Sequence, residues 1–175
     1  RPKPSPILSL FSFLYKKDNV GFTLQFDDAP SEPIEIAHRT GAPSYKADVN
    51  VNEPNISTLD SGYQLIEVPL EAIAWGRSGD KGNKANIGII ARHRNLLPYI
   101  WDTFSEEKIV EIFSHFLEND KIDRHYLPGI SGVNYVLHDV LGGGGTTSLR
   151  NDPQGKGYAQ ILLSCKISVP KNLLV

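Results

Sequence analysis

The residues most able to do chemistry lie in one short polar stretch near the middle of the chain. They are Arg77, Ser78, Gly79, Asp80, Lys81, Gly82 and Asn83. Two cations so close together can bind an anion such as phosphate or carboxylate, and Asp80 can orient either of them. The glycines permit a sharp turn that presents backbone N–H groups. The alternative is a polar hairpin turn between two strands, whose Asp and Asn side chains cap their own backbone.

A second cluster is a run of glycines followed by hydroxyl side chains and a cation. It consists of Gly142, Gly143, Gly144, Gly145, Thr146, Thr147, Ser148, Leu149 and Arg150. Four consecutive glycines indicate that a Cβ is unwelcome there, because of a ligand, a neighbouring backbone or a hinge. The hydroxyls and Arg150 suit an oxyanion, but the spacing matches neither a P-loop nor a dinucleotide fingerprint. A flexible loop between domains is the alternative.

His138 is the third candidate, because histidine titrates near neutral pH and can transfer protons. Asp80 or Asp139 would orient its ring, so we name Asp80 and His138 as candidate catalytic residues. The alternative is a hydrogen-bonded structural histidine. The other histidines lack metal-ligand spacing, and Cys165 is the only cysteine, so neither a metal nor a cofactor is expected.

Hydrophobic patterns predict the elements that position these residues. Apolar, β-prone segments predict strands over residues 64–74, 86–91, 122–127, 133–138 and 165–169. A capping box at Thr103 and Glu106 predicts a helix over 103–117, and Asp152 with Pro153 predicts the start of a second helix. The order β-β-α-β-β-α-β predicts a ferredoxin-like α+β sandwich, with a mostly antiparallel sheet and two helices on one face.

The first third of the chain differs from the rest in composition. Residues 1–63 hold most of the prolines and are expected to form an extended arm, whereas residues 64–175 form the ferredoxin-like domain. Apolar runs at 7–15 and 20–26 predict two strands around a turn, and 27–63 mainly loop. The proline-rich start is typical of a connection between domains, and the chain contains no methionine. We therefore expect this chain to be cut from a longer protein.

The composition argues against several classes of partner. A formal net charge of −2 does not favour a nucleic-acid or anionic-membrane binder. No apolar run approaches the ~20 residues of a membrane span. One cysteine excludes an internal disulfide and fits a reducing compartment, so a cytoplasmic location is expected.

The polar clusters together resemble a known family. Residues 77–83 read Arg-Ser-Gly-Asp-Lys-Gly-Asn, and residues 85–92 read Ala-Asn-Ile-Gly-Ile-Ile-Ala-Arg. A second pattern runs from Asn134 through the four glycines to Lys156. In order and spacing these patterns resemble the signatures of the AtuA-like (acyclic terpene utilisation) family, over about residues 69–168.

The resemblance implies a C-terminal ferredoxin-fold domain that follows an N-terminal α/β domain, in the catabolism of acyclic terpenes or branched acyl-CoA. It adds Asn86, Asn134 and Lys156 to the candidates. The candidate ligand-binding residues are thus Arg77, Ser78, Gly79, Lys81, Gly82, Asn83, Asn86, Asn134, Gly142, Gly143, Gly144, Gly145, Arg150 and Lys156.

Two hypotheses of function follow from the sequence. In the first, the domain supplies an anion-binding polar surface for a CoA-type or carboxylate ligand, to an enzyme site that it shares with the N-terminal domain. By itself the domain would then be inactive. In the second, the domain is a non-catalytic assembly module of a homo-oligomer, whose sheet face and arm are docking elements.

Overall fold

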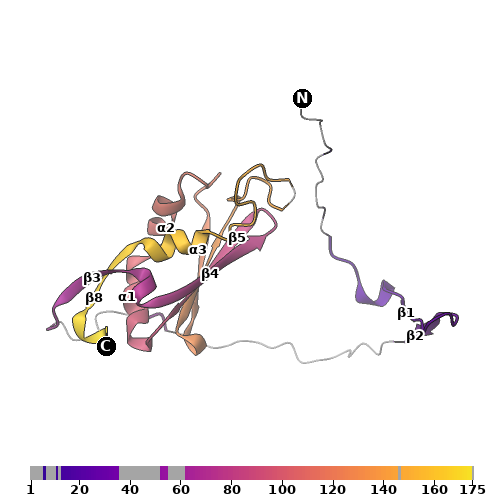
Figure 1. Ribbon diagram of the computed structural model, residues 1–175, viewed down its shortest axis with the longest axis horizontal. Helices are drawn as coiled ribbons and strands as arrows, with labels where there is room; N and C mark the ends of the chain where they lie inside the picture. The colour runs from indigo at the N-terminus through magenta and orange to yellow at the C-terminus, as the bar shows by residue number, and fades with distance from the viewer. Residues whose placement is uncertain are drawn as a thin grey trace. The chain divides into compact units, whose positions relative to one another are not determined.

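The computed structural model describes residues 6, 11, 13–35, 52–54, 62–145 and 147–174. The chain divides into two compact units, of which the smaller comprises Phe11–Asn50 and the larger contains all residues from Val51 onward. Figure 1 shows both units as a ribbon. The boundary expected between residues 63 and 64 stays a prediction.

The smaller unit contains a short antiparallel hairpin of β1 (Phe22–Leu24) and β2 (Glu32–Ile34). The strand predicted over 20–26 is therefore confirmed as β1, but its partner comes from the segment expected to be loop. The chain turns back on itself after β1 because Asp27 adopts a left-handed φ of 46°, which a short Asp side chain tolerates. The strand predicted over 7–15 is wrong at residues 13–15, and its other residues lie mostly outside the described part.

The larger unit contains six strands and three helices among the residues that the structure describes. The strands are β3 (Leu65–Pro69), β4 (Ala74–Lys81), β5 (Lys84–Ala91), β6 (Ile122–Leu127), β7 (Gly132–Leu137) and β8 (Lys166–Pro170). The helices are α1 (Leu97–Thr103), α2 (Glu106–Phe113) and α3 (Tyr158–Ser164).

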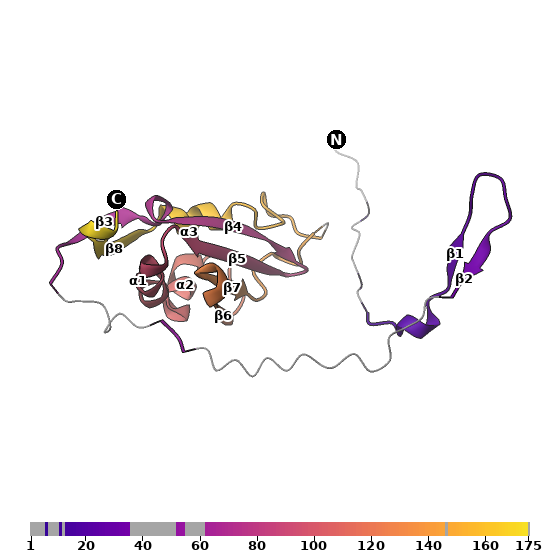
Figure 2. The same cartoon turned by 90° about the horizontal axis from the view of Figure 1, so that it is seen from below.

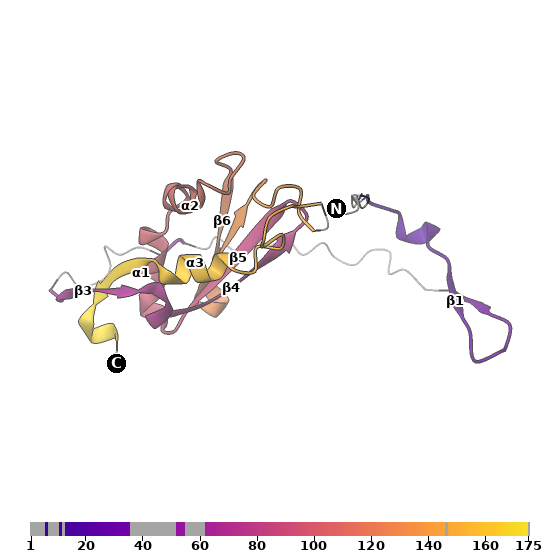
Figure 3. The same ribbon diagram turned by 45° about the horizontal axis from the view of Figure 1, so that its top comes forward.

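Four of these strands form the main sheet, in the order β4-β5-β7-β6, and every neighbouring pair is antiparallel. Figure 2 shows β4 and β5 side by side as a long hairpin. Strands β5 and β6 are therefore parallel to each other, with β7 between them, and α1 and α2 connect them. This split β-α-β arrangement is characteristic of the ferredoxin-like α+β fold, which confirms the predicted class. Strands β3 and β8 form a separate antiparallel pair, and Figure 3 shows α3 leading directly into β8.

The core lies between one face of the main sheet and the helices. Buried apolar side chains of the two central strands point to this face: Ala85, Ile87, Ile89, Val133, Tyr135 and Leu137. The hydroxyl of Tyr135 donates to the Phe104 carbonyl after α1 (2.8 Å), and the Ala159 amide of α3 donates to the Ser78 hydroxyl (2.9 Å). Since Ser78, Ile87 and Tyr135 are aligned across the strands, both helices contact the same face.

Helix α2 belongs to the same layer. The Phe113 ring of α2 packs on the Tyr158 ring of α3, with the ring centroids 5.4 Å apart. All three helices of the described residues thus cover one face of the main sheet. The opposite face, which we call the open face, bears no helix from the described part of the chain.

The polar stretch at 77–83 is mostly strand, whereas a loop between two strands was expected. Strand β4 runs to Lys81 and β5 begins at Lys84, so that only Gly82 and Asn83 form the turn. Gly82 has a φ of 67°, as tight hairpins require. The strand predicted over 64–74 is correspondingly interrupted, because a 3-10 turn separates β3 from β4. Tertiary pairing with β5 overrides the low strand propensity of Gly, Asp and Lys.

The helix predicted over 103–117 corresponds to α2 and is shorter than expected. Helix α1 ends at Thr103 and α2 begins at Glu106, so the N-cap is Ser105 and not Thr103. The Ser105 hydroxyl accepts from the Lys108 amide (3.3 Å). The break lets the Phe104 carbonyl between the helices accept the buried Tyr135 hydroxyl.

The second predicted helix starts later than its sequence signals indicate. Helix α3 begins at Tyr158, and the preceding residues form turns. Asp152 caps a turn, because its carboxylate accepts from the amides of Lys156 (2.9 Å) and Gly157 (2.8 Å). Gly155, with a φ of 58°, prevents the helix from starting at Pro153.

Candidate functional site

The strand register arranges the open face in rows that cross the sheet. The first row contains Trp75, Ile90, Gly132 and Leu127. The second row contains Arg77, Gly88, Asn134 and His125, and the third contains Gly79, Asn86, Val136 and Asp123. Because side chains alternate between the faces of a sheet, all three rows point away from the helices. The open face therefore changes from apolar at one end to polar towards the other.

Arg77 is the main cation of the open face. It is exposed, and in the described part of the chain its guanidinium has no ion pair and no hydrogen bond. Lys81 and Lys84 face each other at the end of the same hairpin and are also exposed. A guanidinium in this state can bind a carboxylate or phosphate through two parallel hydrogen bonds. Lys84 was missed in the sequence, because only the strand pairing places it beside Lys81.

Two amide side chains lie next to Arg77 on the central strands. The Asn86 amide nitrogen donates to the Asn134 side-chain oxygen across β5 and β7 (3.3 Å). This bond fixes the orientation of both amides. Asn86 and Asn134, both predicted from the resemblance, are therefore brought together on the face that carries Arg77.

A shallow pocket of about 230 Å³ opens between the first and second rows. Its lining comprises Trp75, Gly76, Arg77, Gly88, Ile89, Ile90, Leu127, Ile130, Val133 and Asn134. Gly88 leaves room in the second row, since an added Cβ would lie 3.8 Å from its nearest neighbours. The pocket thus has apolar walls and a polar side formed by Arg77 and Asn134.

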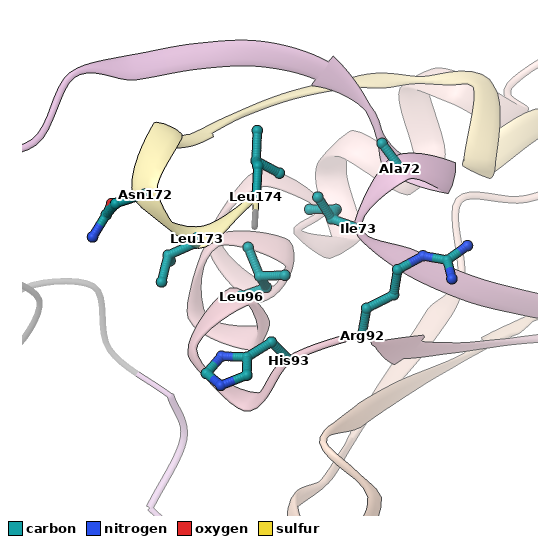
Figure 4. A pocket seen from close by; sticks show the side chains of 8 residues that line it. All are labelled: Ala72, Ile73, Arg92, His93, Leu96, Asn172, Leu173 and Leu174. Atoms are coloured by element: carbon teal, nitrogen blue, oxygen red, sulfur yellow. The ribbon is translucent and has the colours of Figure 1, made fainter.

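A larger pocket of about 460 Å³ lies elsewhere in the domain, and Figure 4 shows Leu96, Leu173 and Leu174 at its centre. None of the predicted site residues lines it. Its Arg92 guanidinium is engaged with the Glu71 carbonyl (3.1 Å) and the Trp75 ring (4.6 Å). This pocket therefore offers no uncommitted arginine, in contrast to the open face.

The glycine loop is held against the β4–β5 turn. All four glycines, 142–145, have positive φ, between 51° and 94°. At Gly144 an added Cβ would lie 2.0 Å from the Gly82 carbonyl oxygen. The Asn83 side chain joins the loop to the turn, because it accepts from the Gly143 amide (2.7 Å) and donates to the Asp139 carboxylate (3.1 Å). The sequence left three explanations for the glycines: a ligand, a neighbouring backbone or a hinge. The geometry supports the neighbouring backbone of the β4–β5 turn.

Arg150 stabilises the glycine loop through hydrogen bonds to backbone carbonyls. Its guanidinium donates to the carbonyls of Phe116 and Val140 and lies 5.8 Å from the Phe116 ring. The Tyr158 hydroxyl donates to the same Val140 carbonyl (3.1 Å), and burial raises the pKa of Tyr158. Since its donors are committed to carbonyls, we assign Arg150 to holding the loop and remove it from the anion-binding set.

Ser78, Asp80 and Lys156 lie together at the β4 edge, on the helix side. The Ser78 hydroxyl donates to the Lys156 carbonyl (3.0 Å) and accepts from α3, so it fastens this helix to the sheet. The Lys156 ammonium is 3.7 Å from the Asp80 carboxylate and also lies against Gly79. These groups therefore act at the edge of the sheet and are separate from the row of Arg77.

His138 is buried and bonded to a carboxylate that sequence reasoning missed. Its Nε2 lies 2.6 Å from the Asp123 carboxylate, and this hydrogen bond is the main reason why the pKa of Asp123 is lowered. The expectation that Asp80 or Asp139 orients His138 is wrong. Asp139 binds the side chains of Asn83 and Asn119 (2.7 Å) instead. Only the β6–β7 register brings Asp123 within reach, so no local motif could have indicated it.

Comparison with known proteins identifies the domain. The family model described as AtuA ferredoxin-like domain matches residues 68–168, from the end of β3 into β8. No curated protein and no solved structure matches the chain. Within the described ranges no helix is long and apolar enough to cross a membrane, and no cluster of His, Cys, Asp or Glu could hold a metal ion.

Proposed function

The chain belongs to the AtuA ferredoxin-like domain family, and from this membership and the geometry of its sheet we propose that it supplies an anion-binding surface to an enzyme site. The ligand is an acyl-CoA or a related carboxylate of acyclic terpene or branched-acid catabolism. An N-terminal α/β domain completes the site and provides the remaining groups.

One observation carries the proposal: Arg77 is exposed on the open face and, among the described residues, has no hydrogen-bond or ion-pair partner, next to the bonded amides of Asn86 and Asn134. An exposed arginine beside fixed hydrogen-bonding groups suits a ligand that brings its own negative charge. Lys81 and Lys84 add two exposed cations at the end of the same hairpin. The proposed anion-binding set is therefore these five residues.

The other candidates support this surface indirectly. The glycine loop and Asn83 fix the hairpin end that carries the two lysines. His138 is the candidate for proton transfer, with Asp123 as the residue that positions its ring. The carboxylate is an acceptor, so Nε2 of His138 carries the proton in this hydrogen bond, and Nδ1 would exchange protons with a substrate.

Thermal unfolding in the presence of candidate ligands tests the proposal. The set comprises CoA, acetyl-CoA, nucleotides, phosphate and short branched acids. A ligand that binds only the folded state at 100 times its Kd adds about 2.7 kcal/mol. For a chain of this size that raises the Tm by roughly 5–10 °C.

The matched variants are Arg77→Ala and Arg94→Ala. Arg94 is also exposed but lies in a 3-10 turn before α1, and so it controls for the loss of a surface cation. We expect Arg77→Ala to abolish the stabilisation and Arg94→Ala to retain it. Equal ligand effects in the two variants would contradict an anion site at Arg77.

The exposed apolar row favours a second candidate function, assembly. Trp75 and Ile130 are 54% exposed, and Ile90 and Leu127 nearly 40%. Exposed apolar residues that cluster in this way often mark protein interfaces. If the domain is an assembly module, Arg77→Ala changes the molar mass measured by light scattering before it changes any ligand affinity.

A further inference from the structure

The pocket between the first and second rows indicates the class of ligand that the open face accepts. We infer that it binds a small monocarboxylic acid, with the carboxylate at Arg77 and an apolar body against the first row. This inference rests on the proposed anion-binding function. It goes further in naming the part of the ligand that this domain holds.

The charge of the lining favours a singly charged anion. Among the ten described residues of its lining Arg77 is the one cation, and none is acidic. Asn134 lies in the same row and contributes an amide on the other side of Gly88. A guanidinium fork and a nearby amide match the two oxygens of one carboxylate.

The apolar walls account for the rest of the ligand. Trp75 and Ile90 form one side, and Leu127 and Ile130 form the other. All four side chains are at least 38% exposed, although three of them come from strands of one sheet. No side chain fills the middle of the first row, because residue 132 is glycine. A Cβ added to Gly132 would lie 2.9 Å from the Ile89 carbonyl oxygen. An apolar body in this space removes exposed apolar surface of both partners from water.

The size of the pocket excludes larger ligands. Sites for drug-sized molecules have volumes of roughly 300–1,000 Å³. At about 230 Å³ the pocket is smaller, and it is open on one side. It therefore accepts a short organic acid and has no room for a nucleotide. The nucleotide of a CoA compound would have to bind outside it.

Gly88→Val is the decisive variant, because it fills the pocket from the middle of β5. The added Cβ meets only ordinary contacts, at 3.8 Å from the Arg77 carbonyl oxygen and the Asn134 side-chain oxygen. Valine is also favoured over glycine in a strand. We therefore expect Gly88→Val to fold with an unchanged or higher Tm.

The probes separate the charge from the apolar body. Hexanoate has both, acetate and inorganic phosphate have only the charge, and hexanamide has only the body. Binding is read from tryptophan fluorescence, since Trp75 lines the pocket and is 54% exposed, whereas Trp101 is 7% exposed and serves as a constant background. Trp75→Phe confirms the origin of the signal.

We expect hexanoate to bind at least about tenfold more tightly than acetate or hexanamide. Gly88→Val weakens hexanoate at least about tenfold, and Arg77→Gln weakens both hexanoate and phosphate. If Gly88→Val does not fold, Ile130→Ala removes one wall instead and should weaken hexanoate alone.

Three results overturn the inference, and they differ from one another. If phosphate binding depends on Arg77 but hexanoate gains nothing over acetate, the anion surface stands and the apolar subsite does not. If no anion binds at all, the proposed function fails with it. A change in molar mass caused by Gly88→Val, without any effect on hexanoate, would identify the row as a protein interface and would also refute the acid site.

Discussion

Two arginines of the candidate set have opposite roles. Arg150 donates to the carbonyls of Phe116 and Val140, so its hydrogen bonds already join the loop to the segment that follows α2. Arg77 is exposed and forms no ion pair with any residue of the described ranges. An anion can therefore be bound at Arg77 without breaking internal hydrogen bonds, which is not true at Arg150.

The two candidate catalytic residues, Asp80 and His138, do not form a pair. Asp80 faces the helix side of β4 and lies 3.7 Å from the Lys156 ammonium. His138 is bonded to Asp123, which stands in the third row of the open face. If protons are transferred in this domain, His138 is the group for it, and Asp80 belongs to a separate surface pair that contributes little stability.

The Asp123–His138 pair makes stability depend on pH. The hydrogen bond from His138, aided by the charges of His138, Lys121 and His125, lowers the pKa of Asp123 in the folded state, while partial burial opposes this shift. A carboxyl group with a lowered pKa stabilises the fold above its unfolded pKa of about 3.9. That contribution is lost as the pH falls through the folded pKa.

We therefore expect Asp123→Asn to be less stable than the unchanged chain at pH 6, with the difference shrinking as the pH falls below the unfolded pKa of about 3.9. Urea unfolding at a series of pH values measures it. The exposed Asp120 supplies the control variant, Asp120→Asn, which should show no such convergence. A deficit of Asp123→Asn that stayed constant down to pH 2.5 would contradict this account.

At the scale of elements, the glycine loop and the β4–β5 turn form one unit. The Val140 amide donates to the Asn83 carbonyl (3.0 Å), and the Asn83 side chain binds Gly143 and Asp139. Gly144 lies so close to Gly82 that a side chain there would collide with its carbonyl. The loop thus determines where the hairpin ends and where Lys81 and Lys84 are held.

Alanine substitutions within the loop test this arrangement. Gly144→Ala should cost more than about 2 kcal/mol, because it adds a collision to the cost of a positive φ. Gly145→Ala is the matched control: its φ of 51° is similar, but its Cβ would meet nothing within 4 Å. It should cost about 1 kcal/mol, from the backbone alone. Thermal unfolding measures both, and equal losses would mean that the loop does not press on the turn.

The elements that the sequence predicts well are those with strong local patterns. The strands predicted over 122–127 and 133–138 agree with β6 and β7, and in the second the apolar residues Val133, Tyr135 and Leu137 alternate along the strand. The predicted helix over 103–117 is longer than α2. Thr103 and Ser105 are both good caps, and only the buried Phe104 carbonyl decides between them. The second helix was started too early, because the Asp-Pro signal stabilises a turn there as well as it would a helix.

For the whole molecule, the fold class was predictable but the composition of the site was not. The motifs identified Arg77, Asn86 and Asn134, and all three lie on the open face. The same motifs included Ser78 and Arg150, which the structure uses to hold a helix and a loop. Arg77 and Arg150, for example, are the same residue type, and both lie in polar, glycine-containing stretches of the sequence. Only the strand register and the long-range packing separate them.

The most direct test of the central claim is to locate the bound anion by NMR. In a titration of the 15N-labelled chain with hexanoate, the reporters are the Arg77 Nε–H, the Asn134 side-chain amide and the Trp75 indole. The Trp101 indole and the Asn95 amide, away from the open face, are controls. We predict large saturable shifts for the three reporters and small shifts for the controls. Shifts concentrated at Arg150 and the glycine loop, or no saturable shift at Arg77, would contradict an anion site on the open face.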